Sequence, residues 1–433
     1  MPDKKFPFIR LDLFKLHDPR DNTKNWLFAK GSCLKDELKR LIESAPFSKT
    51  ELVKHLMKNL DMSISSAERL VYFKKEWYPL AFIKEIVSLI DASRYFTIQN
   101  EIEFLKSSKP PVVEYKAVKE LSIDLCKIVG AHSADGTLRD AYIAITDYHK
   151  STILALINWF KEFGYAQKLR RIGENEYGIK FHSRIISRYL TKLFGFPSGC
   201  KQYTVGEPEI LRNAPLEFRK AFALGALTFE AGVGITNKIE LCVASKAFRD
   251  SISNILTKLN ISHKTMEKQS GGYWRLWGAT PTKDEIVKWM ELFEPNTEKW
   301  FKLRDYVTGF SKGVGSVEEA LKIFNTVYPK QSASKVTLTS VLLAIKALEK
   351  THRYELARYL ANKNSLSSYG GKWAHSLKHY LDILKRAGII SVGRGRFGKK
   401  KSFGTIVREV YTFNRDIADW RLPERPSAIF LNK

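Results

Sequence analysis

The pattern of apolar and polar residues predicts an all-helical N-terminal third, residues 1–106. One helix is expected from Lys49 to Asn59, and a second begins near Ser65 after the turn at 61–63. Their inward positions are apolar at helical spacing: Leu52, Val53, Leu56 and Leu60 in the first helix, and Ala67, Leu70 and Val71 in the second. Two short helices around a tight turn are typical of the helix-turn-helix motif.

The middle of the chain, residues 114–311, repeats one order of elements twice. A polar stretch with two prolines, 106–111, precedes it and is expected to break the N-terminal helices. In each copy an apolar helix is followed by an alternating strand, a second helix and a hairpin. The predicted strands are 141–146 and 238–243, the second helices 151–163 and 247–259, and the hairpins 167–172 with 176–182 and 263–269 with 273–277. The pattern predicts an α+β core of two similar halves, about 114–205 and 206–311, packed about a pseudo-twofold axis.

The C-terminal part, residues 335–433, has the pattern of a winged helix, after linkers expected at 313–316 and 330–334. Apolar periodicity predicts helices at 338–348, 354–360 and 372–387, the last closed by Gly388. A hairpin follows, with strands at 389–392 and 406–413 around the basic loop 393–401. Such a wing is suited to contacts with phosphates or with the minor groove.

Net charge narrows the class of partner further. The 433-residue chain carries 72 lysines and arginines against 46 acidic residues, a formal net charge of +26. Proteins this basic usually bind a polyanion, and nucleic acid is favoured because the basic residues are spread along the whole chain. The sequence shows no signal peptide, membrane-spanning run or lipidation motif, so we expect no membrane partner. Its four cysteines form no CxxC pair, which fits a reducing compartment, and we expect a cytoplasmic, nucleoid-associated protein.

Both terminal parts therefore offer candidate contacts to DNA. In the helix-turn-helix segment the polar outer face carries Arg69 and Tyr72, although the same pattern also suits an ordinary helical hairpin. In the winged helix, the expected contacts are Lys372 and Lys378 on the third helix and Arg394, Arg396, Lys399 and Lys400 in the wing.

Two segments of the duplicated core place an acid where a helix is expected to end. Residues 128–136 and 223–231 each follow an apolar helical run. Each has a glycine in third place, Gly130 or Gly225, and an acid in eighth place, Asp135 or Glu230. An acid at a helix C-terminus meets the negative end of the helix dipole, which is unfavourable without a compensating cation. We expect the glycines to form a close helix interface that brings the two acids side by side.

Paired carboxylates at such a point suit Mg²⁺ or Mn²⁺, which prefer hard oxygen ligands. A metal of this kind activates water and stabilises a leaving oxygen, as phosphodiester hydrolysis requires. Basic groups would stabilise the charge of the transition state, and Lys180 and Arg275 are the catalytic candidates. Three further lysines, Lys201, Lys238 and Lys246, are expected within reach of the same centre.

Because of the two segments 128–136 and 223–231, the chain resembles the single-chain LAGLIDADG homing endonucleases over roughly residues 114–311. The segments 196–199, 210–215 and 218–222 are similar to the lead-in to the second motif of archaeal members. The resemblance implies a core of the αββαββα type in which two antiparallel sheets form a saddle over the DNA major groove. It also implies that Asp135 and Glu230 are metal ligands. Strand residues implied to contact DNA are Arg139, Lys168, Arg170, Lys238, Lys264 and Lys268.

The segments also depart from the family pattern. The sixth position, usually acidic, is Ser133 or Thr228, and His132 occupies a usually apolar place. The leading hypothesis is a monomeric, site-specific, divalent-metal-dependent endonuclease that cuts double-stranded DNA. A transcription regulator that binds DNA without cutting it, built on the same core, is the first alternative. An RNA-binding maturase is the second.

Overall fold

A computed structural model describes the chain over residues 8–19, 21, 25–109, 112–139, 141–165, 167–173, 176–233, 239–266, 272–278, 282–308, 338–363, 377, 380–381, 384–385, 390–400 and 404–413. The predicted linkers at 313–316 and 330–334 lie outside the described residues, as does most of the predicted helix 372–387.

The N-terminal region contains strands as well as helices, so the prediction that it is all-helical is wrong. Its helices are α1 (Leu34–Glu43), α2 (Lys49–Leu60), α3 (Ile64–Val71), α4 (Leu80–Ile90) and α5 (Tyr95–Asn100). Its strands are β1 (Leu27–Lys30), β2 (Tyr78–Pro79), β3 (Phe104–Ser107) and β4 (Tyr115–Lys116). They form one antiparallel sheet in the order β2-β1-β3-β4. With two to four residues each, they are too short to show the apolar–polar alternation that marks a strand.

Local capping fixes the ends of α2 and α3. Ser48 and Glu51 form a reciprocal capping box at the start of α2, which satisfies two backbone N–H groups there. The helix ends at Asp61, whose φ of 50° is left-handed, and Ser63 then caps α3. The two helices and their turn therefore lie where the sequence pattern places them. Their use as a helix-turn-helix stays a prediction.

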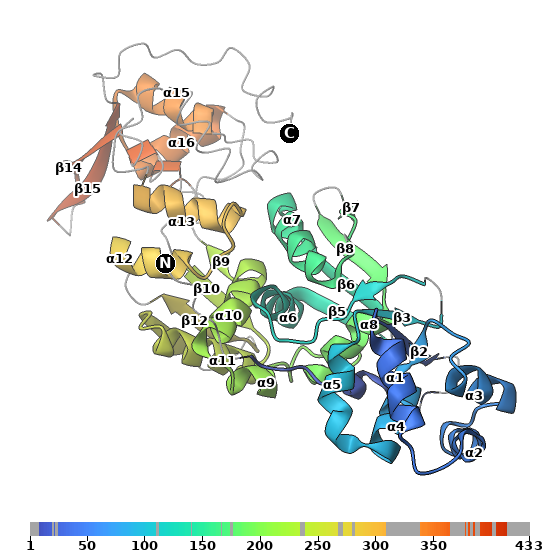
Figure 1. Cartoon of the computed structure of the whole chain (residues 1–433). Coiled ribbons are helices and arrows are strands. Elements are labelled where there is room, and N and C mark those ends of the chain that lie inside the picture. Colours follow the sequence, from blue (N-terminus) through green and yellow to red (C-terminus); the bar gives the residue numbers. More distant parts are fainter. Residues whose placement is uncertain are drawn as a thin grey trace. The chain divides into compact units, whose positions relative to one another are not determined.

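The two copies of the core share one sheet topology (Figure 1). The first copy consists of α6 (Ile123–Asp135), β5 (Gly136–Arg139), β6 (Tyr142–Asp147), α7 (Lys150–Trp159), β7 (Arg170–Arg171) and β8 (Tyr177–His182). The second consists of α10 (Leu216–Glu230), β9 (Gly232–Val233), β10 (Ile239–Val243), α11 (Lys246–Lys258), β11 (His263–Met266) and β12 (Trp274–Gly278). The sheets run β5-β6-β8-β7 and β9-β10-β12-β11, which is the same order of equivalent strands. The chain is thus a mixed α/β protein with small antiparallel sheets.

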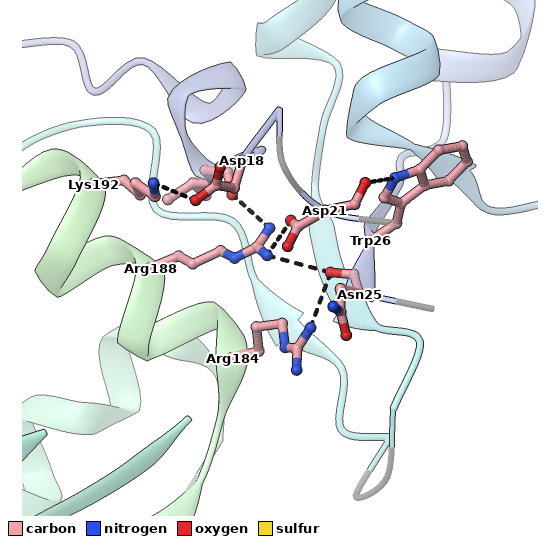
Figure 2. Close-up of polar contacts among 8 residues, drawn as sticks. Asp18, Asp21, Asn25, Trp26, Arg184, Arg188 and Lys192 are labelled. Carbon is pink, nitrogen blue, oxygen red and sulfur yellow. Dashed lines mark hydrogen bonds and ion pairs between the residues drawn. The ribbon is translucent and has the colours of Figure 1, made fainter. Parts of the chain in front are cut away.

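A group of ion pairs joins the N-terminal region to the first copy (Figure 2). The guanidinium of Arg188, at the end of α8 (Arg184–Arg188), is buried, pairs with Asp21 and donates to the carbonyl oxygen of Leu16 at 2.9 Å. Two further contacts lie beside it, Lys192 with Asp18 at 2.5 Å and Arg184 with the carbonyl oxygen of Asn25 at 3.3 Å. These contacts link the N-terminal region to the first copy, and loss of one partner of the buried Arg188–Asp21 pair would leave the other charge without compensation.

The described residues fall into two compact units. The first lies within Met1–Gly232, Glu240–Thr280 and Glu291–Thr297, and so contains the N-terminal region with most of both copies. The second lies within Val233–Ile239, Pro281–Met290 and Glu298–Lys433. The predicted domains, 1–106, 114–311 and 335–433, stay predictions.

The second unit includes α12 (Lys283–Met290), α13 (Glu298–Thr308), α15 (Leu338–Leu348), α16 (Arg353–Lys363) and a three-stranded sheet. The sheet has the order β13-β15-β14, with β13 at Lys350–His352, β14 at Ile390–Lys400 and β15 at Gly404–Phe413. The expectation that 393–401 is a loop is corrected, because β14 continues through Lys400 and pairs with β15. Alternating glycine and arginine at 393–396 suggests a loop from composition, yet it also fits an extended strand.

Candidate functional site

The helices α6 and α10 lie side by side and pack directly against one another (Figure 1). They meet at two glycines. A Cβ added at Gly130 would lie 2.1 Å from the carbonyl oxygen of Phe222 on α10. A Cβ added at Gly225 would lie 2.1 Å from the carbonyl oxygen of Lys127 on α6. Because backbone meets backbone at both places, only glycine fits, and the two helices are held at their closest approach.

Both helices end at their acid and pass straight into a strand. The backbone adopts an extended conformation at Gly136, directly after Asp135, and at Ala231, directly after Glu230. The two acids come from different copies of the core, yet both line one cavity of about 470 Å³. This shared cavity is the candidate functional site.

Residues of both copies and of the segment between them line the rest of the cavity. The first copy supplies Ser133, Ala134, Gly136, Thr137 and Arg139, the second supplies Cys242, Val243, Ala244, Ser245, Phe248 and Tyr273, and the connecting segment supplies Gly199, Cys200, Lys201, Gln202 and Val205. Lys201 is the buried cation of this set, with 9% of its surface exposed. Arg139, at the end of β5, is exposed.

The ammonium of Lys201 is held at the C-terminal end of α6. It donates to the carbonyl oxygen of Ser133 at 2.8 Å and to that of His132. A cation is favourable there because the helix dipole places its negative end at these carbonyls. Burial lowers the pKa of Lys201 to about 8, and the negative charges of Asp135 and Glu230 act in the opposite direction and raise it. The ammonium therefore interacts electrostatically with both acids.

The two basic residues predicted to be catalytic lie on the sheets. Lys180 is on β8, opposite Ala144 of β6, and Arg275 is on β12, opposite Cys242 of β10. The guanidinium of Arg275 is 3.8 Å from the carboxylate of Glu240, and its side chain is 55% exposed. Neither residue is among those that line the cavity. Their catalytic role stays a prediction. Of the further lysines named, Lys246 pairs with Asp250 at 2.6 Å and Lys238 lies outside the described residues.

The side chains of Ser133, Thr228 and His132 have defined surroundings in the structure. The hydroxyl of Ser133 donates to the carbonyl oxygen of Val129 at 2.8 Å, and the hydroxyl oxygen of Thr228 accepts the N–H of Glu294 at 3.0 Å. His132 is fully buried against Phe196, and neither ring nitrogen has a hydrogen-bond partner among the described residues. Burial therefore holds the pKa of His132 well below its usual 6.5, and the ring is neutral.

The donor set is compatible with a hard divalent cation. Asp135 and Glu230 supply carboxylate oxygens at one cavity, which is the type of ligand that such cations prefer. Within the described ranges, no group of three or more His, Cys, Asp or Glu side chains has the geometry of a metal site. Two carboxylates leave the remaining coordination positions to water and phosphate oxygens, as is usual for Mg²⁺.

The strand residues implied to contact DNA are exposed wherever the structure describes them. Arg139, Lys168, Arg170 and Lys264 all carry exposed side chains. Lys238 and Lys268 lie outside the described residues. Contact of these residues with DNA stays a prediction.

A second concave surface lies beside α3 in the N-terminal region. It is a groove of about 740 Å³ whose lining includes Arg69, Lys75, Trp77 and Lys106. The ammonium of Lys106 lies 4.0 Å from the centre of the Trp77 ring, a cation–π contact, and burial lowers its pKa. Arg69 is exposed there, and Tyr72, nearby on the chain, is 49% exposed. Arg69, predicted from the sequence to contact DNA, lines this groove, as does Lys106 of the unpredicted strand β3. Contact of Arg69 and Tyr72 with DNA stays a prediction.

The predicted contacts of the winged helix fall largely outside what the structure describes. Lys372 and Lys378 are not among the described residues. Arg394, Arg396, Lys399 and Lys400 are on β14, where the structure describes the backbone but not these side chains. No helix in the described part of the chain is long and apolar enough to cross a bilayer.

No protein-family model and no curated protein matches this sequence. Among solved structures, a mesophilic variant of the homing endonuclease I-DmoI is similar at 14% identity, over 39% of this chain and 94% of that one, with a TM-score of 0.30. I-DmoI in complex with DNA and Mn is similar at 14% identity, over 36% of this chain and 88% of that one, with a TM-score of 0.28. Full-length DUF199/WhiA from Thermotoga maritima is similar at 15% identity, over 61% of this chain and 91% of that one, with a TM-score of 0.29.

Proposed function

We propose that this chain is a site-specific endonuclease that binds double-stranded DNA and hydrolyses it with a divalent metal ion. The observation that carries the proposal is the meeting of Asp135 and Glu230 at one cavity. Each acid ends a helix of a different copy, and the glycine interface between α6 and α10 brings those helix ends together. A structural role alone would not require an acid at the same unfavourable position in both copies.

In the proposed reaction, Asp135 and Glu230 would supply the carboxylate oxygens that hold Mg²⁺ or Mn²⁺. The chemistry that such an ion supplies when bound is a lowered pKa of coordinated water and stabilisation of the leaving oxygen. Arg139, exposed at the rim, is placed to attract the phosphate. The ammonium of Lys201 adds positive charge where the transition state accumulates negative charge.

DNA binding is proposed through the two four-stranded sheets. Their exposed basic side chains, together with the net charge of +26, suit a polyanion. Since one chain contains both copies, a monomer presents two similar surfaces, which fits a target site of two similar halves. The proposed contacts on these surfaces are Arg139, Lys168, Arg170, Lys238, Lys264 and Lys268.

The test is to compare Asp135→Asn and Glu230→Gln with wild type in cleavage and in binding. Each variant is expected to lose cleavage in Mg²⁺ and Mn²⁺ while it still binds duplex DNA. Glu217→Gln is the matched control, because Glu217 is an exposed carboxylate in the first turn of α10, away from the cavity. Wild-type cutting rates in both acid variants would show that the active site is elsewhere.

A transcription regulator that binds DNA without cutting it is the second candidate. The observation that favours it is the Lys201 ammonium, which partly neutralises the two acids without any metal ion. Under this function, wild type and Asp135→Asn/Glu230→Gln would bind the same sequences, and neither would nick DNA in Mg²⁺ or Mn²⁺.

A further inference from the structure

One face of the N-terminal sheet carries aromatic and basic side chains in alternation. The pairing register places Phe28 of β1 opposite Lys106 of β3, and Lys30 of β1 opposite Phe104 of β3. Phe104 is also opposite Lys116 of β4. Directly opposed residues of an antiparallel pair project to the same side of the sheet, as do residues two apart along one strand. These five side chains therefore form one surface, the aromatic–basic face.

The two faces of this sheet differ in their exposure. On the opposite face, Leu27, Ala29 and Leu105 are at most 1% exposed and belong to the core. On the aromatic–basic face, Phe104 is 41% exposed and Phe28 is half-buried. The solvated face of an antiparallel sheet is normally polar. Phenylalanine rings exposed between lysines therefore indicate a surface for a partner with flat apolar groups and negative charge.

The aromatic–basic face continues into the groove beside α3. Phe28 and Lys106 line this groove of about 740 Å³ together with Trp77, which directly precedes β2. The ammonium of Lys106 lies 4.0 Å from the centre of the Trp77 ring, and that of Lys30 lies 5.7 Å from it. A third aromatic ring is thus added to the surface, and cation–π contacts hold two ammonium groups beside it.

Positive charge is in excess over this surface. Lys30 pairs with Glu76 at 3.2 Å. The charges of Glu114 and Glu76 act on Lys106, but within the described part of the chain neither forms an ion pair with it. The cations of the face and groove are Lys30, Lys106, Lys116, Arg69 and Lys75, whereas the acids that line the groove or act on Lys106 are Asp61, Glu76 and Glu114. The surface therefore attracts an anionic partner.

We propose that the aromatic–basic face and the adjoining groove bind single-stranded DNA. Unpaired bases stack on the exposed rings, and the lysines between the rings contact the intervening phosphates. Such a site is separate from the cavity of Asp135 and Glu230, so it adds a second DNA-binding activity to the proposed endonuclease.

Duplex DNA fits this surface less well than a single strand. The faces of its bases are covered by neighbouring base pairs, so a duplex offers phosphates and groove edges and would leave the phenylalanine rings without a partner. Nothing on the face selects RNA, because lysine and phenylalanine side chains cannot accept a hydrogen bond from a 2′-hydroxyl. The choice of DNA over RNA rests on the proposed function, and the stacking surface itself does not.

Phe104 and Lys106 allow stacking and charge to be tested separately. Phe104→Ala removes an exposed ring and no charge, whereas Lys106→Met removes a charge and no ring. Phe104→Tyr retains a ring that can stack. The matched controls are Phe96→Ala, on α5 and 46% exposed, and Lys39→Met, on α1 and exposed. Neither control residue lies on the sheet or lines the groove.

The experiment measures the fluorescence anisotropy of a labelled oligodeoxythymidine of about ten nucleotides with the full-length protein, over a series of salt concentrations and without divalent metal. We expect Phe104→Ala to weaken binding about tenfold without changing the slope of log affinity against log salt concentration. Lys106→Met should lower that slope by about 0.7, the value for one phosphate of a single strand. Phe104→Tyr and both controls should bind as wild type does, and Phe104→Ala should retain wild-type affinity for a duplex of the same length.

The opposite results would overturn the proposal. They are no binding by wild type, wild-type affinity in both Phe104→Ala and Lys106→Met, or an equal loss of duplex binding in Phe104→Ala. Tighter binding of oligouridine than of oligodeoxythymidine would also overturn it, with RNA as the partner. Thermal unfolding shows whether each variant is folded, and Lys106→Met keeps the test open if Phe104→Ala is not.

Cleavage of duplex DNA in Mn²⁺, measured on the same proteins, separates this proposal from the proposed endonuclease. If wild type cuts the duplex but strand binding does not depend on Phe104 and Lys106, only the single-strand site fails. If strand binding depends on both residues but wild type does not cut, only the endonuclease fails.

Discussion

Replacing Gly130 by alanine is expected to destabilise the core, although alanine is the better helix former. The added Cβ would lie 2.1 Å from the carbonyl oxygen of Phe222 and 2.8 Å from the backbone nitrogen of Ala226. Ordinary contact begins at 3.4 Å, so α6 and α10 would have to separate by roughly 1.3 Å. Both atoms belong to the backbone, and neither can rotate away as a side chain would.

The magnitude follows from two opposing effects. Overpacking in a close-packed interior costs about 1 to 3 kcal/mol, and a backbone clash belongs at the upper end. Alanine gains about 1 kcal/mol over glycine from helix propensity. The net expectation is a loss of about 2 kcal/mol, together with reduced cleavage, because the ends of α6 and α10 carry Asp135 and Glu230.

Hydrogen exchange of peptides from α6 and α10, measured across urea concentrations, gives the stability of this interface. Gly173→Ala is the control, because a Cβ there would meet its nearest neighbour at 3.5 Å, an ordinary contact. A gain of about 1 kcal/mol in Gly130→Ala would mean that helix propensity acts alone. That result would refute the close packing of the two helices.

Three further predictions concern other parts of the chain. His132→Leu should raise stability and flatten its acid dependence, measured as Tm against pH. Burial holds the pKa of His132 well below 6.5 in the folded state, so below pH 6.5 the unfolded state binds more protons than the folded state. The stability of the wild-type protein therefore falls as the pH drops. Parallel curves of Tm against pH for wild type and His132→Leu would contradict this. Arg188→Met should lower the free energy of unfolding by about 3 kcal/mol, because Asp21 loses its partner in a buried contact. We expect the N-terminal region to be proteolysed faster in this variant. An unchanged rate of proteolysis would contradict a stabilising role of the Arg188–Asp21 pair. Arg69→Ala should weaken duplex binding and lower the slope of log affinity against log salt concentration by about one phosphate contact. An unchanged slope would mean that Arg69 on α3 does not contact DNA phosphates.

The repeated elements of the core were predictable because their length exposes their periodicity. The strand predicted at 141–146 is β6 at Tyr142–Asp147, and the helix predicted at 247–259 is α11 at Lys246–Lys258. Each spans enough residues for the two-residue or 3.6-residue period to appear. The N-terminal sheet was missed because β2 and β4 are only two residues long, and pairing with distant strands decides their conformation.

The candidate site was predictable only in part, for a related reason. Asp135 and Glu230 were found because each stands at the same place in a repeated pattern. Lys201 was named from the sequence only as one of three lysines that could reach the same centre, and because it belongs to the segment between the copies, outside any helix or strand, no period singled it out. Its approach to the end of α6 depends on the path of that segment through the fold, and many lysines elsewhere in this basic sequence look alike.

Metal-dependent cleavage by this protein is tested most directly by incubation of the full-length wild-type protein with a randomised duplex library in Mn²⁺, followed by sequencing of the ends produced. We expect cuts on both strands at a discrete set of related sites, lost when Asp135→Asn/Glu230→Gln replaces wild type. Enrichment of bound sequences without any new ends, identical for both proteins, would contradict this expectation and leave a DNA-binding protein without nuclease activity.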